Sequence, residues 1–172
     1  MGNRNIKTSK TDIADYWFSI VDESDLSVDA AEAYERCWRC GYEKSLEKCH
    51  IIPDSLGGED KPSNLVLLCK RCHLENPNIA DPDIMWDWIR AYKTPFYDTF
   101  WVEQGMKEYE FIYRKSLEEE IKERNIFDVI KFNKIVKEQI RKTTYHFGHP
   151  YLNSATIAGV FRISLKKYEE DN

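Results

Sequence analysis

Two short cysteine motifs, Cys37-Trp-Arg-Cys40 and Cys69-Lys-Arg-Cys72, decide how this sequence folds. The two residues inside each pair let a tight turn direct two sulfur atoms at one ion, and tetrahedral zinc takes four such ligands. Gly41 follows the first pair and fits this turn, because glycine tolerates positive φ. The pairs therefore predict a structural zinc site, since four thiolates leave no open coordination position. Two disulfides or a redox dithiol are the competing interpretations, and they lack the expected secretion signal or βαβ context.

The length and composition are those of an ordinary globular protein. The 172 residues are 42% hydrophobic, which fits one domain or a small core with helical additions. No run of about 18 apolar residues occurs and the N-terminus is polar, so we expect no membrane span, no secretion and a cytoplasmic location. Closely spaced cysteines in that reducing compartment favour metal binding. The net charge of -5 argues against a generally basic protein that coats nucleic acid.

Periodicity and turn signals divide the chain into three expected segments. Residues 1–36 are expected to be helical or irregular, with a short helix over 27–36. Residues 37–80 combine cysteine pairs, turns and short apolar runs, a pattern that predicts short strands followed by a helix. Residues 81–172 predict a mainly helical region, with a turn at 146–150 and helices over 84–89, 103–124, 126–142 and 153–167. The expected fold class is α+β, a small zinc-stapled core with mainly helical N- and C-terminal additions.

The segment that starts at His50-Ile-Ile-Pro and continues through Gly57-Gly58 and Asn64-Leu to Cys72-His73 resembles the HNH family of endonucleases. In that family a histidine ends one strand, an asparagine follows a glycine-rich loop, and a second histidine lies on the next helix. The resemblance covers residues 37–76 and includes the framing cysteine pairs. It implies a ββα-metal core. The flanking regions are similar, more loosely, to stand-alone bacterial HNH proteins.

Hydrolysis of a phosphodiester needs an activated water and stabilisation of the charge that develops on phosphorus and on the leaving oxygen. His50 can accept a water proton at physiological pH if its ring is held in the correct tautomer. The resemblance implies that Asn64 orients this ring and that His73 binds a catalytic divalent ion, Mg²⁺ or Mn²⁺. Each residue also has a simpler interpretation. His50 could be a zinc ligand or a satisfied polar residue, Asn64 a turn residue, and His73 a replacement zinc ligand.

Cys49 is the fifth cysteine and stands where many HNH sequences have an aspartate that binds the catalytic ion. A thiolate is a poor ligand for Mg²⁺ and suits zinc or another thiophilic ion. Three interpretations stay open. His73, phosphate oxygens and water hold the ion, or Cys49 binds a softer metal, or the site has lost activity.

Basic residues in two places are expected to contact nucleic acid. Lys70 and Arg71 lie between the second cysteine pair and His73, close to the expected catalytic ion. The helix expected over 126–142 has a predicted apolar stripe of Val129, Phe132, Val136 and Ile140. Its other side carries the basic residues expected to follow phosphates, Lys131, Lys134, Lys137 and Arg141, and an ordinary solvated surface is the alternative.

The sequence thus predicts a metal-dependent HNH endonuclease with a structural zinc, acting on double-stranded DNA. The similarity to stand-alone bacterial members implies a restriction or defence role, and cleavage of both strands favours a homodimer. The alternative is a zinc-dependent nucleic-acid-binding module with a degenerate nuclease site. A third interpretation is an interaction domain with structural zinc only.

Overall fold

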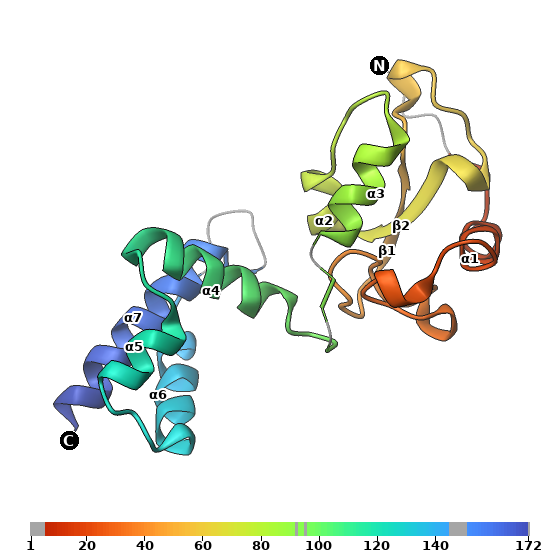
Figure 1. Ribbon diagram of the computed structural model, residues 1–172. Coiled ribbons are helices and arrows are strands. Elements are labelled where there is room, and N and C mark those ends of the chain that lie inside the picture. The colour runs from red at the N-terminus through yellow and green to blue at the C-terminus, as the bar shows by residue number, and fades with distance from the viewer. Residues whose placement is uncertain (1–5, 92, 95, 145–150, 172) are drawn as a thin grey trace. The chain divides into compact units, whose positions relative to one another are not determined.

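The computed structural model describes residues 6–91, 93–94, 96–144 and 151–171, so the turn expected at 146–150 lies outside the described residues. Figure 1 shows helices and one two-stranded antiparallel sheet, in agreement with the expected α+β class. The strands are β1 (Leu46–His50) and β2 (Leu65–Cys69). The α-helices are α1 (Lys10–Phe18), α2 (Lys70–Glu75), α3 (Pro82–Arg90), α4 (Phe100–Tyr113), α5 (Leu117–Glu123), α6 (Val129–Arg141) and α7 (Ser154–Glu170). Short 3₁₀ helices cover Glu23–Asp25, Ala30–Glu32, Asp54–Leu56 and Pro62–Asn64.

The chain forms two compact units, Met1–Phe100 and Trp101–Asn172. The first contains the sheet and the second contains most of α4 together with α5, α6 and α7. This division is coarser than the three segments expected from the sequence, whose bounds at 36/37 and 80/81 stay predictions. None of the described helices has both the length and the apolar character needed to cross a bilayer.

The hairpin of the first unit has its two strands in a fixed register. His50 lies opposite Leu65 at the loop end, and Leu46 lies opposite Cys69 at the other end. All of β2 is buried, because its continuous apolar run is in contact with both α1 and α2. The Trp17 indole of α1 donates to the Leu65 carbonyl oxygen at 2.7 Å. The loop end of β1 and the cysteine end of β2 are therefore at opposite ends of one short, buried hairpin.

The other expected elements of the first unit are partly confirmed. The helix expected over 84–89 is α3, and Trp86 packs edge-on against Trp17 with ring centroids 4.6 Å apart. The short helix expected over 27–36 is wrong, because only Ala30–Glu32 forms a 3₁₀ turn there. Ser27 does not cap it. The Ser27 hydroxyl is buried and donates to the Arg39 carbonyl oxygen at 2.8 Å, while Asp29 caps the turn.

The second unit has its own core. It is lined by residues from every helix of the unit: Tyr109, Leu117, Ile126, Phe132, Ile135, Ala158, Phe161, Leu165 and Tyr168. The single helix expected over 103–124 is wrong, because the chain breaks between α4 and α5. Arg114 has a φ of 57°, and Ser116 starts α5 with a capping box to Glu119. The predicted start of α7 is confirmed, since Asn153 Oδ1 accepts a hydrogen bond from Thr156 N at 2.8 Å.

The apolar stripe predicted for α6 is wrong in two of its four positions. Phe132, Ile135 and Gln139 are the buried residues of this helix. Val129 and Ile140 are 60% and 43% exposed. The buried face is therefore rotated toward Ile135. Because α6 carries apolar residues on more than one side, the sequence did not show which of these sides is buried.

Candidate metal centre and active site

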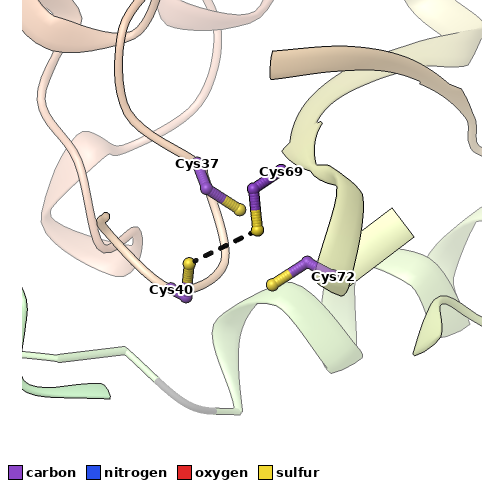
Figure 2. A group of neighbouring side chains, drawn as sticks. All are labelled: Cys37, Cys40, Cys69 and Cys72. Atoms are coloured by element: carbon purple, nitrogen blue, oxygen red, sulfur yellow. Dashed lines mark hydrogen bonds between the residues drawn. The ribbon is translucent and has the colours of Figure 1, made fainter. Parts of the chain in front are cut away.

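Four cysteines come together where β2 meets α2. Figure 2 shows Cys37 and Cys40 on one loop, Cys69 at the end of β2 and Cys72 on α2, with their sulfur atoms directed toward one another. All four are buried, and their sulfur atoms lie within 4.8 Å of one another. The Cys40 and Cys69 sulfurs are 3.9 Å apart. Tetrahedral zinc with bonds of about 2.3 Å places its sulfurs about 3.8 Å apart, whereas a disulfide needs about 2.05 Å, so the cluster fits zinc.

The loop that carries Cys37 and Cys40 has the backbone expected of a metal-binding turn. Gly41 has a φ of 71° and donates its N–H to the Cys37 carbonyl oxygen at 2.8 Å. A Cβ atom at Gly41 would lie 3.0 Å from the Ser27 carbonyl oxygen, so both conformation and space favour glycine. The expectation drawn from the sequence for this residue is confirmed.

The electrostatics of the cluster also suit a dication. Hydrogen bonds with Cys37, Cys40 and Cys72 lower the pKa of Cys69, whereas hydrogen bonds with Cys37, Cys40 and Cys69 raise the pKa of Cys72. The sulfurs therefore compete for negative charge at one point, and a bound Zn²⁺ relieves that competition.

Arg39, between the first two cysteines, places a buried positive charge beside the cluster. Its Nη1 lies 3.8 Å from Cys72 Sγ and 2.8 Å from a Glu75 carboxylate oxygen. Its guanidinium carbon is 4.1 Å from the centroid of the Trp88 ring. This charge offsets part of the net negative charge of zinc with four thiolates. No role was predicted for Arg39 from the sequence, although its place inside the first cysteine pair was a visible signal.

His50 ends β1 and lines an open pocket of about 730 Å³ on the first unit. Ile6 and Lys7 of the N-terminal segment 6–8 also line the pocket. Asp60 accepts hydrogen bonds from the backbone N–H groups of Lys7 at 2.6 Å and Thr8 at 3.2 Å. Lys48 donates to the carbonyl oxygens of Ile6 and Thr8. The segment 6–8 is therefore tied to both the hairpin and its loop, a contact that no sequence pattern indicated.

Asn64 clamps the loop between the strands. Its Nδ2 donates to the carbonyl oxygens of Ile52 and Glu59, both at 3.0 Å, and its Oδ1 accepts from Ile52 N at 2.9 Å. Its own carbonyl oxygen accepts from Ile51 N at 2.8 Å. Both amide hydrogens are thus used on the loop backbone. Asn64 acts on the position of His50 through the chain that follows it.

His73 lies on α2 beside a carboxylate of β1. His73 Nδ1 is 2.7 Å from Glu47 Oε2, and the two side chains are 36% and 43% exposed. His73 was predicted from the sequence as a site residue, whereas Glu47 was not. A histidine paired with a carboxylate is the usual arrangement of a metal-binding imidazole, so this donor set fits a divalent ion.

Cys49 is buried and separate from the four-cysteine cluster. Its Sγ donates to the His50 carbonyl oxygen at 3.6 Å. Burial is the main cause that raises the pKa of Cys49 to about 12. Among the described residues, the four cysteines are the one group of three or more potential ligands close enough for a single ion. The structure does not bring Cys49, His50 and His73 into a second such group.

The expected nucleic-acid contacts differ in accessibility. Lys70 is exposed, whereas the Arg71 side chain is only 10% exposed and lies 3.9 Å from Glu75. Lys131 donates to the Asp171 carbonyl oxygen at 3.1 Å. The remaining residues of the expected basic face, Lys134, Lys137 and Arg141, are exposed on α6.

Comparison with known proteins gives one match. The model of the HNH endonuclease family matches residues 35–78. No curated protein and no solved structure matches the chain. The matched segment holds both cysteine pairs, the whole β1–β2 hairpin and α2. Residues 35–78 of this chain are therefore similar to the HNH endonuclease family.

Proposed function

We propose that this protein is a metal-dependent endonuclease that hydrolyses phosphodiester bonds of double-stranded DNA. The observation that carries the proposal is the position of His50, at the loop end of the hairpin, in an open pocket and within the segment matched to the HNH family. An accessible imidazole at such a place can reach both a water molecule and a phosphate.

His50 is the proposed general base. Its neutral ring accepts a proton from the water that attacks phosphorus, and the new P–O bond forms as the bond to the leaving oxygen breaks. Asn64 supports this step by fixing the loop that starts after His50. His73 is the proposed ligand of a divalent ion, Mg²⁺ or Mn²⁺, which when bound stabilises the leaving oxygen. The four cysteines hold zinc with a structural role.

The DNA contacts proposed for this enzyme are electrostatic. Lys70 stands one helical turn before His73, and the exposed residues Lys134, Lys137 and Arg141 can each neutralise a phosphate. Arg71 and Lys131 also belong to the proposed set of DNA contacts, but each is expected to contribute less to DNA binding. The Arg71 side chain is mostly buried, and Lys131 donates a hydrogen bond to the C-terminal end of α7. We propose that two copies of the chain, as a homodimer, cut the two DNA strands. The proposed biological role is restriction or defence.

A second candidate function is a zinc-dependent nucleic-acid-binding module without hydrolytic activity. The specific observation that favours it is Cys49. Burial keeps this residue a neutral thiol at physiological pH, at the position where many HNH sequences have a metal-binding aspartate.

Plasmid nicking tests the proposal. Purified protein is incubated with methylated and unmethylated plasmid and with Mg²⁺, Mn²⁺, Ni²⁺ or Zn²⁺ in separate reactions, beside His50→Ala with the same zinc content and circular dichroism spectrum. The proposal expects nicking by the wild type and at least a hundredfold loss in His50→Ala, about the value of one general base. Binding to the plasmid without nicking under every condition would overturn it in favour of the second candidate.

A further inference from the structure

Glu47 has no role in the proposed mechanism, although it contacts His73, the proposed ligand of the divalent ion. The two residues are far apart in sequence, yet their side chains meet at 2.7 Å between Oε2 and Nδ1. We propose that Glu47 is a positioning residue that holds His73 in the tautomer with its proton on Nδ1, and so presents Nε2 to the divalent ion. This inference rests on the proposed function to the extent that His73 is the ligand of that ion.

The chemistry of the pair determines the direction of the hydrogen bond. An ionised carboxylate can only accept, and a neutral imidazole has one nitrogen that donates and one that accepts. Nδ1 beside Glu47 must therefore carry the proton. The lone pair is then on Nε2, which is the nitrogen left for a metal ion. A carboxylate partner also makes that nitrogen a stronger base toward a metal ion.

Both members of the pair stand on rigid parts of the fold. Glu47 lies in the middle of β1, opposite Leu68 of β2. His73 follows Cys72 on α2, so its backbone is fixed by two cysteines of the zinc cluster, Cys69 and Cys72. Zinc binding and strand pairing thus hold the imidazole and the carboxylate at hydrogen-bonding distance before any ion or substrate arrives.

Accessibility separates this pair from a purely structural one. The His73 side chain is 36% exposed and the Glu47 side chain 43%, so neither needs a partner to compensate for burial. An exposed pair of this kind contributes little to stability. The contact of Glu47 with His73, the expected metal ligand, therefore points to a role of Glu47 in the orientation of His73.

The alternation of side chains along β1 adds a second argument. Glu47 and Cys49 point to the same face of the strand, because their positions differ by two. Cys49 occupies the place of the usual aspartate, and Glu47 supplies a carboxylate on that face, two residues earlier.

The test reads the tautomer of His73 directly. Two-bond ¹H–¹⁵N correlation spectra at alkaline pH distinguish Nδ1–H from Nε2–H in the zinc-loaded protein without added divalent ion. We expect Nδ1–H for the wild type and for Glu35→Ala, an exposed glutamate of the same unit that serves as the matched control. Glu47→Ala should shift His73 toward Nε2–H or a mixture. An Nε2–H tautomer in the wild type, or an unchanged tautomer in Glu47→Ala, would overturn the proposal.

Calorimetric titration with Mn²⁺ gives a second readout. Glu47→Ala should weaken Mn²⁺ binding by about 10–100-fold with unchanged zinc content, and His73→Ala should abolish it. Equal Mn²⁺ affinity in the wild type and Glu47→Ala contradicts the inference. Loss of Mn²⁺ binding in Glu47→Ala without a change of tautomer also contradicts it, because Glu47 would then be a ligand itself. Neither readout uses DNA or cleavage, so failure of the nuclease proposal would be seen separately.

Discussion

Asn64 and Ile52 are joined by two hydrogen bonds across the loop: Ile52 N donates to Asn64 Oδ1 at 2.9 Å, and Asn64 Nδ2 donates to the Ile52 carbonyl oxygen at 3.0 Å. This reciprocal pair fixes the chain two residues after His50. Because both amide hydrogens of Asn64 are used on backbone, the proposed effect of Asn64 on the His50 ring is indirect.

Asn64→Ala should therefore loosen the loop. It removes both bonds to Ile52 and the bond to the Glu59 carbonyl oxygen, and we expect a stability loss of about 1–3 kcal/mol. Amide hydrogen exchange should accelerate at residues 52–59, and nicking should fall at least tenfold while zinc content is unchanged. Unchanged exchange in this loop would show that Asn64 is not its clamp.

Gly58→Ala should be more severe. A Cβ atom at Gly58 would lie 1.7 Å from the Ile52 carbonyl oxygen and 2.8 Å from Asn64 Nδ2, so the loop backbone has to move. The expected result is a lower melting temperature and loss of nicking. Gly159→Ala is the matched control, because nothing lies within 4 Å of its Cβ position on α7 and alanine favours a helix by about 0.5–1 kcal/mol. A melting temperature for Gly58→Ala at or above that of the wild type would contradict the close approach.

The five cysteines should separate into two classes. Cys37→Ser removes one ligand of the cluster, so bound zinc should be lost and the Met1–Phe100 unit should unfold, since binding energy of a structural zinc is folding energy. Cys49→Ser should keep full zinc content, because Cys49 is not part of the cluster. Elemental analysis by mass spectrometry with circular dichroism checks both. Zinc loss in Cys49→Ser of a folded protein would mean that the ligand set is different.

The second unit should show a pH-dependent contribution from Glu120. Burial disfavours its charge, but the hydrogen bond and charge of Arg124, 2.7 Å away, and the charge of Arg162, 2.9 Å away, outweigh burial and lower the Glu120 pKa. A lowered pKa in the folded state stabilises the fold above the unfolded value of about 4.5 and loses this contribution as pH falls toward the folded value.

Glu120→Gln should accordingly destabilise the second unit by about 1–3 kcal/mol at neutral pH and by progressively less below the ordinary glutamate pKa. Hydrogen exchange of α5 and α7 amides measures this without interference from zinc release in the first unit. Glu118→Gln is the control, because its pair with Lys122 is exposed and should contribute nothing measurable. A Glu120→Gln deficit that grows at low pH would contradict the sign.

The sequence predicted the parts of the site whose geometry is local. The two-residue spacing within each cysteine pair restricts the local backbone, and so does the glycine after Cys40. The zinc cluster and the positive φ of Gly41 could therefore be predicted from the sequence. Glu47 was missed for the opposite reason. Its partner His73 is brought close only by pairing of the strands and docking of α2, and neither residue has a neighbour in sequence that signals the contact.

The errors in the helical region have a similar origin. The apolar positions from Met106 to Ile121 continue at helical spacing through the break between α4 and α5, where a positive φ at Arg114 and the Ser116 cap interrupt the helix. Hydrophobic periodicity shows which residues are apolar, but it does not show where one residue with positive φ interrupts a helix. On α6, tertiary packing, including contact with α7, buries Ile135 and leaves Val129 exposed.

The register of β1 and β2 has a consequence for the order in which the protein matures. A shift of the register by one residue would turn every side chain of a strand to the opposite face. Cys69, at the end of β2, belongs to the cysteine cluster, so metal binding there fixes the position of β2. Zinc capture at one end of the hairpin thus locks the alignment that sets His50 at the other end. Under the proposed function, a newly synthesised chain would therefore act on DNA only after it had bound zinc.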